Sequence, residues 1–121
     1  MPVDDAMLQT ALGEAGTLDE VGPRFDALGR RYSGKVRENF TQGDTRTIIV
    51  TDRVSAFDVV LGTIPFKGQV LNAMAEYWFR HSASVFPNHL LEVPDPQAMR
   101  CIECEPIPVE KGPGAKVIGA T

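Results

Sequence analysis

Two short stretches of the sequence concentrate the side chains that could do chemistry. The first, Ser33-Gly34-Lys35-Val36-Arg37, places a glycine and two cations at the start of a predicted strand. A glycine lets an anion approach the backbone, and Lys35 and Arg37 would point to the same face of a strand. The pattern has phosphate-binding character, but it lacks the spaced glycines and the Lys-Ser/Thr ending of a P-loop, and taken alone such a Gly-Lys pair more often marks a turn. The alternative is a turn beside a solvated lysine.

The second stretch, residues 49–58, is an apolar run that ends in charged and hydroxyl side chains. These side chains belong to Asp52, Arg53, Ser55 and Asp58. Two carboxylates, a guanidinium and a hydroxyl so close together could bind the polar groups of a ligand or hold a metal. The alternative is an Asp–Arg pair and an Asx-type turn that close a strand.

A further cation stands where the sequence predicts the start of a helix. Lys67 and Gly68 come directly before the apolar residues of that helix. The N-terminus of a helix carries partial positive charge and disfavours a lysine, so Lys67 suggests that an anion lies nearby.

The helix that begins there should be the longest element, and it must end before Pro87. Its apolar residues recur at the spacing of one helix face: Leu71, Met74, Ala75, Trp78 and Phe79. We expect the helix to lie across a sheet and bury this face, with Trp78 and Phe79 in the core. A shorter helix is expected near residues 7–15, followed by a loop.

The strands that must position the polar stretches are predicted from two-fold periodicity. Residues 31–40 and 47–51 should form a β-hairpin around Gln42-Gly43-Asp44. Further strands are expected over residues 59–64, 88–93 and 99–104, with Pro94-Asp95-Pro96 separating the last two. The predicted fold class is α+β, a small antiparallel β-sheet covered on one face by one long helix.

Composition and charge argue against several classes of protein. The 121 residues suit one domain, and a net charge of −4 with a pI near 5.1 argues against general nucleic-acid binding. No run approaches the roughly 20 apolar residues of a membrane span, and no signal peptide is recognisable, so a cytoplasmic location is expected. Cys101 and Cys104 lack the further ligands of a zinc site, and we expect structural thiols and no bound metal.

Five motifs stand in the order found in the SAICAR synthetase (phosphoribosylaminoimidazole-succinocarboxamide synthase) family, and residues 28–110 resemble that family. The motifs are YSGKVRE (32–38), TDRVSAFD (51–58), IPFKGQVLN (64–72), PNHLLE (87–92) and PIPVE (106–110). The resemblance implies an ATP-dependent ligase of de novo purine (IMP) biosynthesis. Such a ligase joins L-aspartate to carboxyaminoimidazole ribonucleotide (CAIR) and gives SAICAR, ADP and phosphate. It also implies a fold like the N-terminal lobe of protein kinases, with ATP and Mg²⁺ as cofactors.

The same resemblance implies roles for individual residues, although it assigns no catalytic residue. The residues expected to bind ATP are Gly34, Lys35, Arg37 and Glu110, the last beside adenine. The residues expected to border CAIR or aspartate are Asp52, Arg53, Ser55, Asp58, Lys67 and Gly68.

The resemblance stops after Glu110, where the family continues into a hinge and a large second domain. We therefore expect an N-terminal extension (1–27), a SAICAR synthetase-like domain (28–110) and a divergent tail (111–121), with the second domain absent. The magnesium ligands would lie in that absent domain, and a truncated chain is expected to have no ligase activity alone. The alternative is an inactive remnant that at most binds nucleotide or associates with a partner chain.

Overall fold

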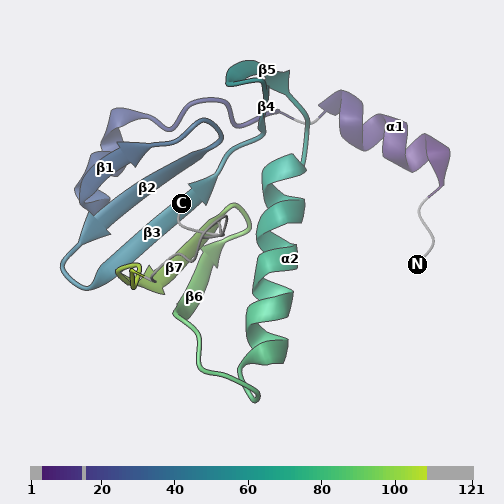
Figure 1. Ribbon diagram of the computed structural model, residues 1–121. Coiled ribbons are helices and arrows are strands. Elements are labelled where there is room, and N and C mark those ends of the chain that lie inside the picture. The colour runs from purple at the N-terminus through teal and green to yellow at the C-terminus, as the bar shows by residue number, and fades with distance from the viewer. Residues whose placement is uncertain (1–3, 15, 109–121) are drawn as a thin grey trace, which may run out of the picture.

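The computed structural model describes residues 4–14 and 16–108 as an α+β fold (Figure 1). The described elements follow in the order α1 (Asp5–Glu14), the 3-10 helix η1 (Pro23–Leu28), β1 (Arg30–Ser33), β2 (Arg37–Gln42), β3 (Thr45–Val50), β4 (Arg53–Ala56), β5 (Val59–Thr63), α2 (Lys67–Ser82), β6 (Leu90–Asp95) and β7 (Ala98–Ile102). None of the helices in this part of the chain is long and apolar enough to cross a membrane.

Five strands form an antiparallel sheet in the order β1-β2-β3-β7-β6, and β4 and β5 form a separate hairpin. The predicted hairpin is confirmed, because β2 pairs with β3 from Gln42↔Thr45 onward and Gly43 turns the chain with a φ of 58°. The single strand predicted over residues 31–40 is wrong. Gly34, Lys35 and Val36 form a turn that divides it into β1 and β2.

The break between the last two strands, predicted at Pro94-Asp95-Pro96, lies further along the chain. Pro94 and Asp95 belong to β6, and the chain turns at Pro96 and Gln97 before β7 begins. A proline is tolerated there because β6 is the edge strand of the sheet, where one of its backbone sides needs no ladder hydrogen bond.

One face of the sheet, which we name the packed face, carries the hydrophobic core. Phe40, Ile49 and Ala98 project from β2, β3 and β7 and are buried together with Val21. Further apolar side chains from the segment before β1 pack against them: Leu18, Phe25 and Leu28. Residues within the predicted 1–27 extension thus help to cover the sheet.

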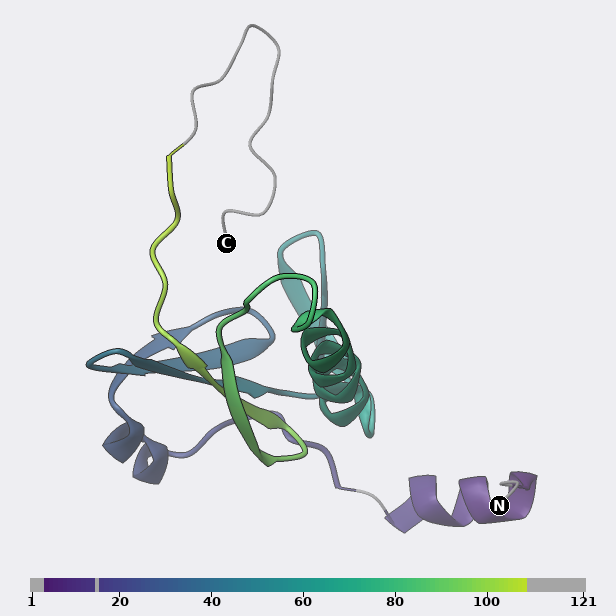
Figure 2. The same cartoon turned by 90° about the horizontal axis from the view of Figure 1, so that it is seen from below.

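Helix α2 lies on the other side, beside what we name the open face (Figure 2). The expectation that α2 buries its whole apolar stripe against the sheet is wrong, because Met74 is 55% exposed and Trp78, expected in the core, is 64% exposed. Ala75 and Phe79 of the same stripe are half-buried. Gly68 and Asn72 are the residues of α2 that are buried. Helical periodicity marks an apolar face, but it does not specify what that face contacts, and here the core forms on the opposite side of the sheet.

The two cysteines lie at the end of the sheet as free thiols. Cys101 is buried in β7 and Cys104 is exposed. Burial raises the pKa of the Cys101 thiol, and the neighbouring Cys104 adds to that rise. A buried thiol that stays protonated is a poor nucleophile, as expected for a structural cysteine.

Candidate functional site

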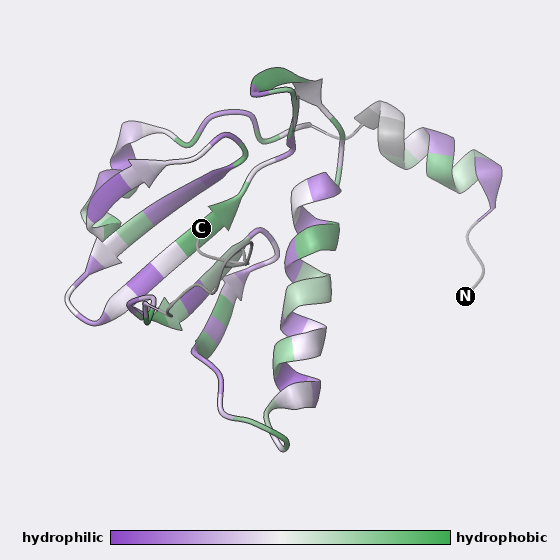
Figure 3. Ribbon diagram, in the orientation of Figure 1, coloured by the Kyte–Doolittle hydropathy of each residue, from purple (hydrophilic) through white to green (hydrophobic). Residues whose placement is uncertain are grey.

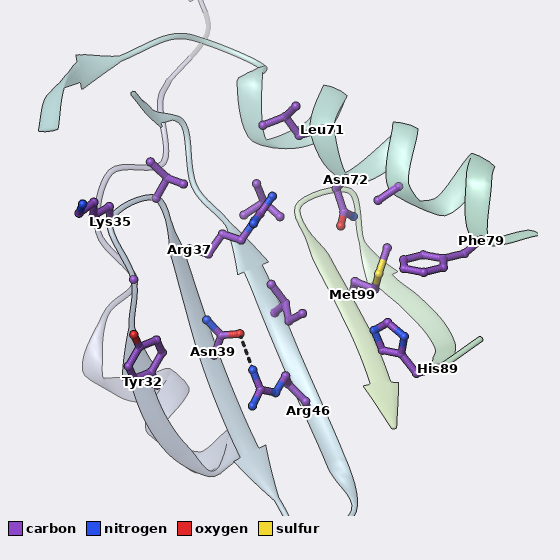
Figure 4. A pocket seen from close by; sticks show the side chains of 15 residues that line it. Tyr32, Lys35, Arg37, Asn39, Arg46, Leu71, Asn72, Phe79, His89 and Met99 are labelled. Carbon is purple, nitrogen blue, oxygen red and sulfur yellow. Dashed lines mark hydrogen bonds between the residues drawn. The ribbon is translucent and has the colours of Figure 1, made fainter. Parts of the chain in front are cut away.

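A cavity of about 740 Å³ lies between the open face and α2 (Figure 4). Its lining comes from β1, the β1–β2 turn, β2, β3, α2 and β7, together with His89. The volume is in the range of pockets that bind small molecules. In Figure 3, β2 is largely hydrophilic, whereas β3 is hydrophobic toward its arrowhead.

The register of the strands explains which side chains reach the cavity. Partners directly opposite each other in an antiparallel pair share a face, and Arg37 pairs with Val50 while Asn39 pairs with Ile48. Ile48 in turn pairs with Met99. The open face therefore has a polar side toward β2 and an apolar side toward β7. Leu71, Ala75 and Phe79 of α2 complete the apolar side.

The charged side chains around the cavity are all basic. Lys35, Arg37 and Arg46 line it, with His89 at the far end, and none of the described lining residues carries a carboxylate. Glu103, outside the lining, binds Arg46 through two hydrogen bonds of 2.7 and 2.8 Å. These bonds raise the pKa of Arg46 and lower the pKa of Glu103.

Arg37 differs from Arg46 in having no such partner. Within residues 4–14 and 16–108, no carboxylate forms a salt bridge with the Arg37 guanidinium. An exposed guanidinium that lines a cavity can donate to a phosphate or carboxylate of a ligand.

The Gly34–Lys35–Val36 turn is held at the cavity by hydrogen bonds to its backbone. The Gly34 N–H donates to the Arg37 carbonyl over 2.8 Å. Thr51, which is fully buried, donates to the Val36 carbonyl from its N–H over 3.0 Å and from its hydroxyl over 2.6 Å. The second polar stretch of the sequence therefore positions the first through Thr51, a residue that sequence reasoning did not single out.

Asp52, predicted to meet a substrate, is buried and has its carboxylate occupied from within the chain. One oxygen accepts the Leu18 N–H over 2.8 Å. The other accepts the Gly68 N–H over 2.8 Å and the Gln97 side-chain amide over 3.2 Å. A carboxylate that binds the first N–H groups of a helix also interacts favourably with the helix dipole. Asp52 thus joins α2 to the sheet.

Lys67 and Gly68 take part in the same junction. The Lys67 ammonium donates to the Arg53 carbonyl over 2.7 Å, and Asp52 is the anion that lies nearest to this helix start. A Cβ on Gly68 would lie 2.3 Å from the Val50 carbonyl oxygen, so only glycine permits this close approach. The predicted contacts of Lys67 and Gly68 with a substrate stay predictions.

The remaining residues of the second stretch lie on or near the β4–β5 hairpin. Arg53 donates to the buried Glu38 carboxylate over 3.0 Å and to the Thr51 hydroxyl over 2.9 Å. Ser55 is half-buried within β4. Asp58, at the hairpin turn, forms an ion pair with Lys35.

The structure thus brings together three of the predicted ATP-binding residues, Gly34, Lys35 and Arg37, at one end of the cavity. Glu110 lies outside the described residues. None of the residues predicted to bind CAIR or aspartate lines the cavity: Asp52, Arg53, Ser55, Asp58, Lys67 and Gly68. Within the described residues, no group of three or more His, Cys, Asp or Glu side chains could hold a metal ion.

Comparison with known proteins gives consistent matches. The sequence profile of the SAICAR synthetase family matches residues 30–111. The chain is 46% identical over 83 residues to a phosphoribosylaminoimidazole-succinocarboxamide synthase of Legionella pneumophila, a match that covers 69% of this chain and 27% of the relative. A chloroplastic synthase of the same name from Vigna aconitifolia is 41% identical over 119 residues, covering 98% of this chain and 35% of the relative.

Solved structures show the same fold. A SAICAR synthase from Saccharomyces cerevisiae, complexed with SAICAR, superposes with a TM-score of 0.62 at 22% identity, over 72% of this chain and 37% of that chain. A second SAICAR synthase structure gives a TM-score of 0.63. The chain spans between about a quarter and two fifths of the length of these relatives.

Proposed function

The chain belongs to the SAICAR synthetase family, and from that membership we propose that its open face is the nucleotide-binding part of an ATP-dependent ligase. The reaction proposed for the whole protein is the joining of L-aspartate to CAIR. In it, the terminal phosphoryl group of ATP passes to the CAIR carboxylate. The aspartate amine then displaces phosphate, which leaves ADP, phosphate and SAICAR.

The observation that supports this proposal best is the division of the cavity into a cationic end and an apolar end. Lys35 and Arg37 stand at one end, and Phe79 and Met99 stand at the other, beside the His89 ring. A nucleotide has the same division, because its phosphates are anionic and its base is flat and largely apolar. Cations placed beside the phosphates would offset the charge that moves during phosphoryl transfer.

Magnesium, the other expected cofactor, would be held by the nucleotide phosphates and by carboxylates outside the described residues, which offer no group of three ligands for it. The step proposed for the residues of this chain is therefore limited to binding and orienting the nucleotide.

Calorimetric titration of the chain with ATP and, separately, with adenosine tests the proposal. We expect ATP to bind more tightly than adenosine, because adenosine cannot use the cationic end. Arg37→Met should weaken ATP binding by about tenfold, the low end for the loss of a charge-assisted hydrogen bond, and should leave adenosine binding unchanged.

Arg30→Met is the matched control, because Arg30 is also an exposed arginine that opens a strand, but it does not line the cavity. It should bind ATP as the unmodified chain does. Absence of ATP binding, or equal ATP affinity in the Arg37→Met variant, would contradict the proposal.

A further inference from the structure

An ion pair between Lys35 and Asp58 connects the β4–β5 hairpin to the rim of the cavity. Lys35 lines the cavity, whereas Asp58 sits in the turn of the hairpin and does not. Within the described residues, neither side chain has another hydrogen-bonding partner. One of the cations that line the cavity is therefore already paired with a carboxylate of the chain itself.

The turn that carries Asp58 is held in a conformation that Phe57 disfavours, whereas Asp tolerates it. Phe57 and Asp58 have φ values of 51° and 64°, and the flanking Ala56 and Val59 are paired. Such two-residue turns favour Asn and Gly, and a bulky residue at positive φ is strained. The Phe57 side chain is also 100% exposed, so packing within the described chain does not compensate for the strain.

The base of the β4–β5 hairpin is held more firmly than its tip. At the base, the Thr51 hydroxyl binds the Val36 carbonyl, and the Ile64 N–H donates to the Asp52 carbonyl over 2.9 Å; Thr51 and Asp52 are buried. At the tip, the Lys35 side chain is 52% exposed and that of Asp58 is 87% exposed. Exposed ion pairs are weak because water screens them, so a ligand can break the tip contact without disturbing the base.

We propose that the Lys35–Asp58 ion pair is a latch that the phosphates of a bound nucleotide open. The phosphates take over the Lys35 ammonium, and the released Asp58 carboxylate and the strained Phe57–Asp58 turn move away from the cavity rim. This inference rests on the proposed nucleotide binding and adds a regulation to it. Occupancy of the cavity by a nucleotide then changes the position of the hairpin turn at Phe57 and Asp58 and frees a carboxylate for a second ligand.

Removing the latch carboxylate should strengthen nucleotide binding, because no part of the chain then competes for Lys35. We expect Asp58→Asn to bind ATP about two- to fivefold more tightly than the unmodified chain, as the weakness of an exposed pair implies. Glu92→Gln is the matched control, since it removes the carboxylate of another exposed ion pair, with Arg100, that lies away from the cavity. It should leave ATP affinity unchanged.

Amide chemical shifts of Phe57 and Asp58 report the hairpin directly. ATP should move these signals in the unmodified chain, whereas in Lys35→Met the turn should already be released and ATP should not move them. If ATP binds both the unmodified chain and Asp58→Asn with equal affinity, or binds without moving the turn signals, the latch is wrong and nucleotide binding stands. If no variant binds ATP, the proposed function fails and the latch fails with it.

Discussion

The same strands of the sheet present two faces with opposite properties. On the packed face, Phe40 is completely buried between η1 and the sheet, and its ring also receives the Arg31 guanidinium at 4.9 Å. On the open face, Arg37 and Asn39 border a cavity. These residues alternate along β2, where side chains one residue apart point to opposite faces.

This contrast separates stability from binding within one element. Burial of apolar side chains supplies most of the stabilisation of a fold, and it is concentrated on the packed face. The open face keeps cations beside a hollow, where they contribute little to stability and are available to a ligand, while Val50 and Met99 on this face are buried. A substitution in β2 should therefore affect the fold or the ligand according to which face it lies on.

The largest loss of stability should come from truncating a buried side chain on the packed face. Phe40→Ala should lower the free energy of unfolding by about 3–5 kcal/mol, because it leaves a cavity where a fully buried ring was. Trp78→Ala removes a larger ring on the side of α2, but that ring is 64% exposed, and the loss should be about 1 kcal/mol or less. Chemical denaturation of both variants measures the difference.

Phe40→Leu keeps most of the buried volume and serves as the control if Phe40→Ala does not fold. It should fall between the unmodified chain and Phe40→Ala. Equal losses for Phe40→Ala and Trp78→Ala would show that the two sides of the sheet do not differ in this way.

A smaller effect is expected where α2 is joined to the sheet. Asp52→Asn should cost about 2 kcal/mol, since an amide retains one acceptor oxygen for three donors and loses the charge that favours a helix N-terminus. Asp95→Asn is a suitable control, because Asp95 is exposed and accepts one N–H, from Gln97. Denaturation curves that coincide for Asp52→Asn and the unmodified chain would remove the structural role of Asp52.

Local patterns predicted the elements better than their packing. The hairpin around Gly43 and the helix that starts at Lys67 follow from turn residues and periodicity, which act over a few residues. The core could not be predicted in the same way. Val21 lies in a segment with no regular periodicity, yet it covers Phe40 and Ile49 because the chain folds back beneath the sheet.

In the candidate site, too, residues close together in the sequence were predicted, and residues brought together only by the fold were missed. Gly34, Lys35 and Arg37 stand in one short stretch and were assigned to ATP by the resemblance of that motif to the family, and they do reach the cavity. Arg46 and His89 were missed, because only strand pairing and the path after α2 bring them to the same hollow. Thr51 was missed for another reason, since a buried hydroxyl that binds a carbonyl leaves no distinctive pattern in the sequence.

The smallest effect should appear at the Arg46–Glu103 pair on the margin of the open face. Hydrogen bonds from Arg46 lower the pKa of Glu103 in the folded chain, so the ionised pair stabilises the fold above the ordinary glutamate pKa of about 4.3. This contribution is lost as the pH falls through the lowered pKa. Glu103→Gln should therefore cost up to about 1 kcal/mol near neutral pH, because the pair is partly exposed, and progressively less in acid.

Urea unfolding of the unmodified chain and of Glu103→Gln, from neutral pH to below the lowered pKa of Glu103, measures the difference in their free energies of unfolding. Repeating the comparison in an Arg46→Met background provides the control, since Glu103 then has no guanidinium to bind and its substitution should have little effect at any pH. A difference that persisted below the lowered pKa, or that survived the loss of Arg46, would show that Glu103 stabilises the sheet by packing. In that case the margin of the open face would carry more of the stability than its exposure implies, and the contrast between the two faces would be weaker.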